Sequence, residues 1–183
     1  ALPISVLREN VEELNGLIQE ILDFRKAEDA GFSHTHIRRV SVSSLLRTQF
    51  EWFYPLSEQH QIQFKIDAPK ELYWNTDSVY FKKILANLIS NAFKYTEDGG
   101  TVRISLHEEE NFLVLKVYNT GKGIEEADMQ NIFDRYRILG TMDNDDNRQN
   151  TTRNGLGLFI CHSLVQSLGG KINIESEVGQ YAE

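Results

Sequence analysis

One helix constrains this chain more than any other feature. The segment from Asp77 to about Tyr95 is predicted to be helical, and four polar residues recur in it at spacings of four, three and one: Asn87, Asn91, Lys94 and Tyr95. They therefore share one side of the helix. Two amides, a cation and a phenol in line suit a magnesium–phosphate complex, because amide oxygens are acceptable Mg²⁺ ligands. The alternative is a solvated helix face with capping asparagines.

Two glycine-containing segments follow this helix. The run from Asn119 to Ile124 comes directly after a predicted strand and contains Gly121 and Gly123, which allow a ligand to approach the backbone closely. An ordinary glycine turn is the alternative. The second segment, Gly155-Leu156-Gly157, stands where a polar loop becomes a helix. Open N–H groups and the helix dipole favour an anion there, although a glycine N-cap would leave the same pattern.

The remaining segments predict a chain of mixed helices and strands. A turn is expected at Asp98-Gly99-Gly100, and residues 140–153 have no periodicity and are predicted to be a mobile loop. Helices are predicted from Ser41 or Ser43 to about His60 and from Gly155 to Leu168, with short helices in 125–137. Strands are predicted over 61–67, 72–75, 101–107, 112–118 and 171–175, the third and fourth forming a hairpin.

The first 30 residues carry a heptad-like apolar seam, typical of a helix in a bundle. Alone, such a helix would expose its seam, so it implies a partner helix. Residues 31–40 are polar and basic and are predicted to be a linker. The chain stops at Glu183 without an obvious terminating element, so we expect the natural protein to extend beyond both ends.

Composition narrows the function classes. The net charge of −8 argues against a general affinity for nucleic acid or anionic membrane, since both need a basic face. No apolar stretch approaches the roughly 18 residues of a membrane span. Cys161 is the only cysteine, which excludes a disulfide within the chain and makes a cysteine-based metal site implausible. Its apolar helical surroundings predict a buried core residue.

Taken together and in this order, the three polar and glycine segments resemble the nucleotide-binding fold of histidine kinases, Hsp90-type chaperones, type II topoisomerases and MutL-type repair proteins. Three other segments resemble histidine kinases in particular. Ile132-Phe133-Asp134-Arg135-Tyr136 is similar to their phenylalanine-rich box, Ile21 to Lys26 to the end of their second dimerisation helix, and Leu168 to Gly179 to their last helix–strand passage. The chain therefore resembles the catalytic domain of a sensor histidine kinase.

The resemblance implies an α+β fold of the Bergerat type. This is a two-layer α/β sandwich with a mixed, mostly antiparallel sheet, preceded by one long bundle or coiled-coil helix. It further implies that residues 1–30 are part of a dimerisation domain, residues 31–40 a linker and residues 41–183 the catalytic ATP-binding domain. ATP with Mg²⁺ would bind between the long helix and a lid.

The resemblance also assigns roles by position. Asn87 and Asn91 would hold Mg²⁺ and the phosphates, and Lys94 and Tyr95 would contact phosphate or ribose. Arg137 would reach the γ-phosphate, although the local spacing differs by one residue and a solvated arginine is the alternative. The remaining contacts are expected around the adenine pocket and the lid hinge, and they are Asn119, Gly121, Gly123, Ile124, Gly155, Leu156 and Gly157.

The sequence departs from the family pattern at two positions. Most of the family has Asp where this chain has Asn119, whose side chain either accepts the adenine amino group through its oxygen or donates to a ring nitrogen. Loss of a hydrogen bond to a charged group costs about 1.5–3 kcal/mol, so weaker nucleotide binding is expected. Arg153 stands where the lid often has glycine. The arginine is expected to stiffen the hinge or to add a cation near the phosphates.

The expected activity is transfer of the γ-phosphoryl group of ATP to a histidine outside this chain, because none of its five histidines has the context of an acceptor. A response-regulator receiver domain would take the phosphoryl group next. The parent is expected to be a homodimer joined by its dimerisation helices, with this part on the cytoplasmic side of an inner-membrane sensor. A degenerate nucleotide-binding module with weak or no kinase activity is the alternative. A chaperone or topoisomerase ATPase is disfavoured, since that chemistry normally needs a carboxylate where Asn87 stands.

Overall fold

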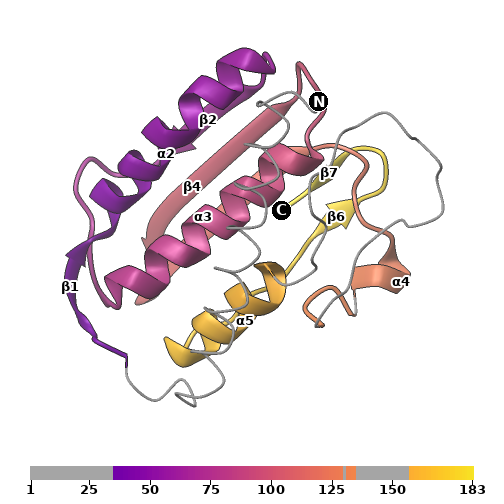
Figure 1. The fold of residues 1–183 in the computed structure, drawn as a ribbon. Coiled ribbons are helices and arrows are strands. Elements are labelled where there is room, and N and C mark those ends of the chain that lie inside the picture. The colour runs from indigo at the N-terminus through magenta and orange to yellow at the C-terminus, as the bar shows by residue number, and fades with distance from the viewer. Residues whose placement is uncertain (1–34, 130, 135–156) are drawn as a thin grey trace, which may run out of the picture.

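The computed structural model of this chain describes residues 35–129, 131–134 and 157–183. The predicted amino-terminal seam helix and the predicted loop over 140–153 lie outside these ranges. The described elements, shown in Figure 1, are β1 (Arg38–Ser41), α2 (Val42–Gln59), β2 (Gln63–Asp67), β3 (Tyr73–Thr76), α3 (Ser78–Tyr95), β4 (Thr101–Glu109), β5 (Phe112–Thr120), α4 (Glu126–Met129), α5 (Gly157–Ser167), β6 (Ser176–Glu177) and β7 (Tyr181–Ala182).

Five of these strands form one sheet in the order β2-β4-β5-β7-β6. The β2–β4 pair is parallel and the other three pairs are antiparallel. The parallel pair is possible because α3 lies between β2 and β4 in the sequence and returns the chain to the same end of the sheet. The predicted mixed, mostly antiparallel sheet is therefore confirmed. β1 and β3 form a separate two-stranded antiparallel ribbon.

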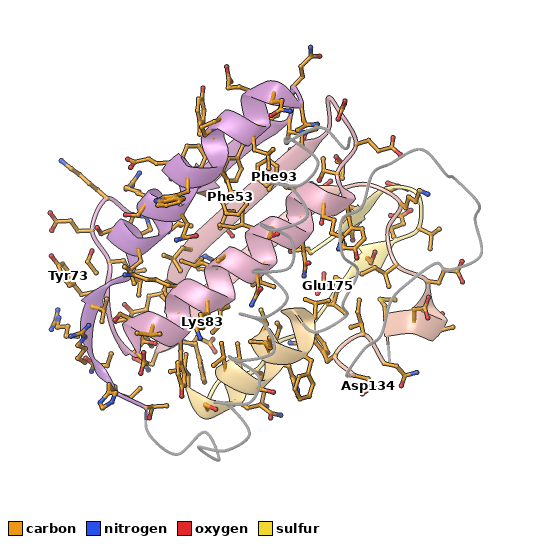
Figure 2. The ribbon with its side chains drawn as sticks, in the orientation of Figure 1. Phe53, Tyr73, Lys83, Phe93, Asp134 and Glu175 are labelled. Carbon is orange, nitrogen blue, oxygen red and sulfur yellow. The ribbon has the colours of Figure 1, made fainter. Side chains whose placement is uncertain are left out.

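The main core lies between the sheet and the helices α2 and α3, which cover one face of it (Figure 1). On β4 the alternate residues Val102, Ile104 and Leu106 are fully buried, as the period of two in a half-buried strand requires. Aromatic rings join the two helices, with Phe53 of α2 stacked on Phe93 of α3 at a centroid distance of 5.5 Å (Figure 2). The predicted two-layer arrangement is thus present.

A smaller cluster attaches α5 to the other flank of α3. Ile160 and Leu164 on α5 are buried against Ile84 on α3. These two α5 residues are four apart, which is the spacing of one helix face. The contact fixes the start of α5 beside the middle of α3.

Two sequence-based predictions are wrong in detail. Residues 171–175 were predicted to be a strand, but pairing begins with the Glu175–Glu183 backbone bonds and continues through β6 and β7. Residues 171–174 pair with no other strand within the described ranges. The end of the predicted linker also differs, because Arg38–Ser41 forms β1 against β3. The sequence of β1 shows no alternation of polar and apolar residues, since the strand is only partly buried.

Of the predicted short helices in 125–137, the described part contains α4 and a turn at 131–134. Among the helices that the structure describes, none is sufficiently long and apolar to cross a membrane.

Candidate functional site

Asp77 fixes where α3 begins. Its buried carboxylate accepts backbone N–H groups of Val79 at 2.8 Å and Tyr80 at 3.2 Å, and that of His36 at 2.8 Å. Burial alone would raise the pKa of Asp77, but these N–H groups, with His36 first among them, outweigh it and hold the pKa below its usual value. The predicted helix start is confirmed, and it sets which face of α3 each later residue occupies.

The polar side of α3 faces the start of α5. A Cβ atom placed on Gly157 would lie 3.7 Å from Oδ1 of Asn87 and 3.8 Å from Nδ2 of Asn91. Both amides are half-buried, whereas Leu85 and Ile89 on the opposite side are fully buried in the core. The structure therefore brings together two of the predicted amides and the glycine predicted to face the phosphates. Three other predicted residues, Arg137, Gly155 and Leu156, lie outside the described ranges.

Lys94 and Tyr95 end the polar side of α3. The Lys94 ammonium lies 5.7 Å from the centre of the Tyr95 ring, and the Tyr95 side chain is half exposed. A cation over an aromatic ring at this distance is attracted by the ring's electron-rich face. The arrangement places one positive charge a single turn beyond Asn91.

The glycine segment after β5 lies against the carboxyl end of α3. A Cβ atom on Gly121 would come within 2.3 Å of the backbone oxygen of Tyr95, so only glycine fits without a shift of backbone. Gly123 has φ of +66°, in the left-handed region that favours glycine. Both glycines of the predicted segment are thus required by the fold itself, Gly121 against the end of α3 and Gly123 against the backbone of Glu177.

Asn119 lies on the helix-facing side of the sheet, since it pairs in register with the buried Val102. Its side-chain Nδ2 donates to the backbone oxygen of Thr120 at 3.1 Å. One donor of the amide is therefore used within the protein. Among the described residues, the side-chain oxygen of Asn119 has no hydrogen-bond donor.

The β6–β7 hairpin holds the glycine segment in place, which the sequence did not predict. The Gly121 N–H donates to the backbone oxygen of Gln180 at 3.1 Å, and the Gly179 N–H donates to that of Lys122 at 2.7 Å. The Ile124 N–H donates to Oγ of Ser176 at 2.8 Å. The only available signal was the resemblance of residues 175–179 to a family segment, which says nothing about backbone partners.

The phenylalanine-rich box packs on α5. Ile132 is buried, and the Phe133 ring stacks on the His162 ring at a centroid distance of 5.3 Å. The described segment 131–134 therefore contacts α5. His162 therefore has a packing role in the described part of the chain.

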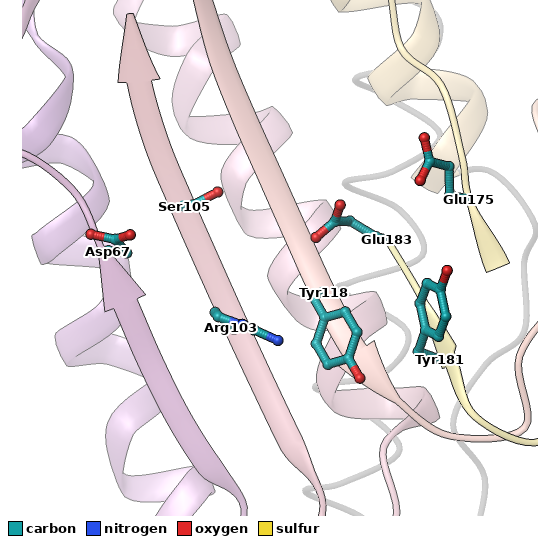
Figure 3. Close-up of a pocket in the computed structure, with 7 residues that line it drawn as sticks. All are labelled: Asp67, Arg103, Ser105, Tyr118, Glu175, Tyr181 and Glu183. Atoms are coloured by element: carbon teal, nitrogen blue, oxygen red, sulfur yellow. The ribbon is translucent and has the colours of Figure 1, made fainter. Parts of the chain in front are cut away.

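Among the surface hollows lined by described residues, two are well defined, and Asn87 lines neither of them. One, of about 400 Å³, lies on the sheet face away from the helices and is shown in Figure 3. Arg103 there lies 4.8 Å above the Tyr118 ring, and Tyr118 stacks on Tyr181. The other hollow, of about 440 Å³, borders Gly121 at the end of α3. Within the described ranges, no group of three or more His, Cys, Asp or Glu residues could hold a metal ion.

A match to a family profile shows to which protein family the chain belongs. The profile of the "Histidine kinase-, DNA gyrase B-, and HSP90-like ATPase" family matches residues 76–183, which is more than half of the chain and contains α3, both glycine segments and the hairpin. The chain belongs to this family. Its members bind ATP, so the described wall of α3, Gly157 and the 119–124 segment is part of an ATP-binding catalytic domain of the histidine kinase type.

Individual relatives place this ATPase-family domain among the sensor kinases. It is 32% identical over 97% of its length to the circadian input-output histidine kinase CikA of Synechococcus elongatus, of which it covers 23%. Two solved structures share the fold. Full-length ShkA in complex with AMPPNP has a TM-score of 0.78 at 24% identity, over 98% of this chain and 36% of ShkA. The histidine kinase ThkA in complex with the response regulator TrrA has a TM-score of 0.73 at 21% identity, over 98% of this chain and 48% of ThkA.

The chain spans 23% of the length of CikA and 30% of the length of another relative, the sensor protein SrrB of Staphylococcus aureus. What those whole proteins sense, modify and assemble with therefore belongs to longer chains than this one.

Proposed function

We propose that this domain binds Mg²⁺ and ATP and transfers the γ-phosphoryl group to a histidine outside these residues, as the catalytic domain of a sensor histidine kinase. One observation carries the proposal. Asn87 and Asn91 on α3 meet Gly157 at the start of α5, where the amides and an open backbone converge on one small space. Helix starts attract phosphate, and amide oxygens are suitable ligands for Mg²⁺.

The residues present fit such a group. The space in front of Gly157 would be filled by a methyl group in contact with both amides, so it has room for a ligand atom only because the residue is glycine. Asn87 would hold the ion through Oδ1. Asn91, whose Nδ2 faces the same space, would donate to a phosphate oxygen in this orientation and would hold the ion once its amide is turned. Lys94 would meet phosphate as a point charge. When bound, Mg²⁺ would neutralise charge on the phosphates of ATP. The chain's own residues would bind and orient the nucleotide, since phosphoryl transfer depends mainly on positioning.

Transfer is favoured over hydrolysis by the identity of Asn87. Hydrolytic members of this fold need a base for water, and a neutral amide cannot take a proton at neutral pH. The acceptor histidine is proposed to lie on a dimerisation helix, to which residues 1–30 contribute the second helix, followed by a linker at 31–40. Arg137, Gly155, Leu156 and Tyr95 remain proposed contacts for the phosphates or the ribose.

At the base end of the site, the proposal gives Asn119 the role of acceptor. One Nδ2–H is bonded to the Thr120 oxygen, which favours the side-chain oxygen for the adenine amino group. Gly121, Gly123 and Ile124 would shape the rest of that pocket. Replacing Asn119 with aspartate should tighten ATP binding by about tenfold or more, because charge-assisted bonds are stronger. An unchanged affinity in a calorimetric titration would contradict this role.

The parent protein is proposed to be a homodimer through its dimerisation helices, an inner-membrane sensor with this domain on the cytoplasmic side, and a phosphoryl donor to a receiver domain. Neither nucleic acid nor membrane is proposed as a partner of this domain, in view of the net charge of −8. The kinase ThkA bound to its response regulator is a precedent for the receiver partner only.

Calorimetric titration with ATP, in Mg²⁺ and in a chelator, tests the nucleotide site. We expect binding that is tighter with Mg²⁺, and loss of most of it in an Asn87→Ala, Asn91→Ala double variant. Ser90→Ala is the matched control, since Ser90 lies on the same helix and is exposed. No binding at millimolar ATP would refute the site and favour a degenerate module.

Phosphoryl transfer is tested separately. The domain is mixed with a dimerisation domain that carries an acceptor histidine, and with ATP labelled at the γ position. An acid-labile, base-stable label on that partner is the expected product, because phosphohistidine has this stability. Binding of ATP without any such label, together with release of inorganic phosphate, would replace the kinase proposal with an ATPase.

A further inference from the structure

We propose that Cys161 is a positioning residue that fixes the orientation of the Asn87 amide, so that its oxygen faces the space in front of Gly157. The inference rests on the proposed Mg²⁺–ATP site and adds a residue to it. Cys161 would act through Asn87 and would not touch the nucleotide.

The position of Cys161 supports this role. It is fully buried on α5, one helical turn after Gly157. Its thiol donates a long, weak hydrogen bond to the backbone oxygen of Ile84 on α3, with 3.9 Å between sulfur and oxygen. Ile84 lies three residues before Asn87 and shares its side of α3. The Asn87 side chain therefore lies between two α5 residues, Gly157 and Cys161.

The chemistry of the thiol decides which end of the amide faces it. The single hydrogen of the thiol is directed to the Ile84 oxygen. The same sulfur makes a side-chain hydrogen bond with Asn87. Towards Asn87 the sulfur can then only accept, so it requires the NH₂ group of the amide.

The opposite end of the amide agrees with this reading. Oδ1 of Asn87 is the atom closest to a Cβ position on Gly157, at 3.7 Å, whereas Cγ of Asn87 lies at 4.0 Å, beyond Nδ2 of Asn91 at 3.8 Å. A flipped amide would aim its oxygen at a sulfur with no hydrogen left to give, and its NH₂ group at the cation. Because cations take oxygen ligands, only the observed orientation makes Asn87 useful to Mg²⁺. Cys161 distinguishes between two orientations that have the same shape.

Two substitutions separate this role from simple packing. Cys161→Val keeps an apolar side chain of similar size but removes the acceptor, whereas Cys161→Ser keeps a donor and acceptor. The measured quantity is the ratio of ATP dissociation constants without and with Mg²⁺. We expect this ratio to fall about three- to tenfold in Cys161→Val and to be retained in Cys161→Ser, because sulfur is a weak acceptor and the lost preference is modest.

Ile160→Val is the matched packing control. Ile160 is buried on the same helix and packs on Ile84, so its truncation should lower the melting temperature and leave the Mg²⁺ ratio unchanged. An equal fall of the ratio in Ile160→Val and Cys161→Val would reduce Cys161 to a core residue. An unchanged ratio in Cys161→Val would overturn the inference while leaving the Mg²⁺–ATP site in place.

A second readout needs no nucleotide, so it keeps the inference distinct from the proposed function. In ¹⁵N-labelled protein, the two side-chain amide protons of Asn87 should be widely separated in shift and slow to exchange in the wild type and in Cys161→Ser. They should collapse towards free-amide behaviour in Cys161→Val. Free-amide behaviour already in the wild type would refute the inference, even if ATP binds.

Discussion

Replacing Gly157 with alanine should separate ligand binding from folding. The added methyl group would meet Asn87 at 3.7 Å and Asn91 at 3.8 Å, which is ordinary van der Waals contact and needs no shift of the protein. The φ angle of Gly157 is outside the left-handed region, so an alanine is not strained there. The same methyl group would nevertheless fill the space in which a ligand oxygen is proposed to lie.

The two expected effects have opposite signs. Where the backbone is compatible, a glycine-to-alanine change stabilises a protein by about 0.4–1 kcal/mol by restricting the unfolded chain. For a domain of this size that corresponds to a rise in melting temperature of up to about 4 °C. Loss of one hydrogen bond to a charged group costs about 1.5–3 kcal/mol. The affinity for Mg²⁺–ATP should therefore fall about 10- to 100-fold.

The assay pairs thermal unfolding without nucleotide with calorimetric titration of ATP in Mg²⁺. Ser90→Ala serves as the control, because it alters an exposed residue of α3 that is not among the nearest neighbours of a Cβ atom on Gly157. A melting temperature that is unchanged or raised, together with weaker binding, supports the reasoning. An ATP affinity within twofold of wild type would refute the placement of the ligand beside Gly157. A melting temperature more than about 5 °C lower would refute the geometry of the open space.

Three further changes test the fold around the site. Gly121→Ala should destabilise the domain by about 1–3 kcal/mol in urea unfolding, because its methyl group would overlap the Tyr95 backbone oxygen; an unchanged midpoint would contradict that close approach. Asp77→Ala should cost about 0.5–2 kcal/mol at pH 7. Since the folded-state pKa of Asp77 is lowered, its charge stabilises fully above about pH 4, and the difference from wild type should narrow as the pH falls further, as unfolding at several pH values would show. Ile104→Ala, at a fully buried position, should cost about 2–5 kcal/mol in the same unfolding assay, and a cost under 1 kcal/mol would contradict its place in the core.

The elements that the sequence predicted well are those whose signals are local. Asp77 caps α3 through its own side chain, and the period of the helix then fixes which face carries Asn87 and Asn91. The β4–β5 hairpin was predicted because Val102, Ile104 and Leu106 alternate with polar residues, although both strands extend further than expected. Such patterns reflect burial on one face, which the sequence records directly.

What the sequence could not predict depends on partners distant in the chain. The Gly121 N–H is hydrogen-bonded to the backbone oxygen of Gln180. A backbone hydrogen bond does not depend on the side chain, so the residue types do not predict it. The polar strand β1 has no apolar alternation, so only its pairing with β3 reveals it. The hydrogen bond between Cys161 and Asn87 likewise joins two helices. Their relative placement follows from the packing of Ile160 and Leu164 on Ile84. Cys161 itself was correctly predicted to be buried.

Hydrogen exchange in the β6–β7 hairpin should depend on whether the nucleotide site is occupied, because the hairpin is hydrogen-bonded to the 119–124 segment. An amide hydrogen exchanges with solvent only when its bond opens, and a ligand that binds the closed form makes opening rarer in proportion to its saturation. The N–H groups of Gly121 and Gly179 are bonded across this contact. Deuterium uptake at these two amides would therefore slow when ATP occupies the wall on the other side of the 119–124 segment, although β6 and β7 contact no proposed ligand atom.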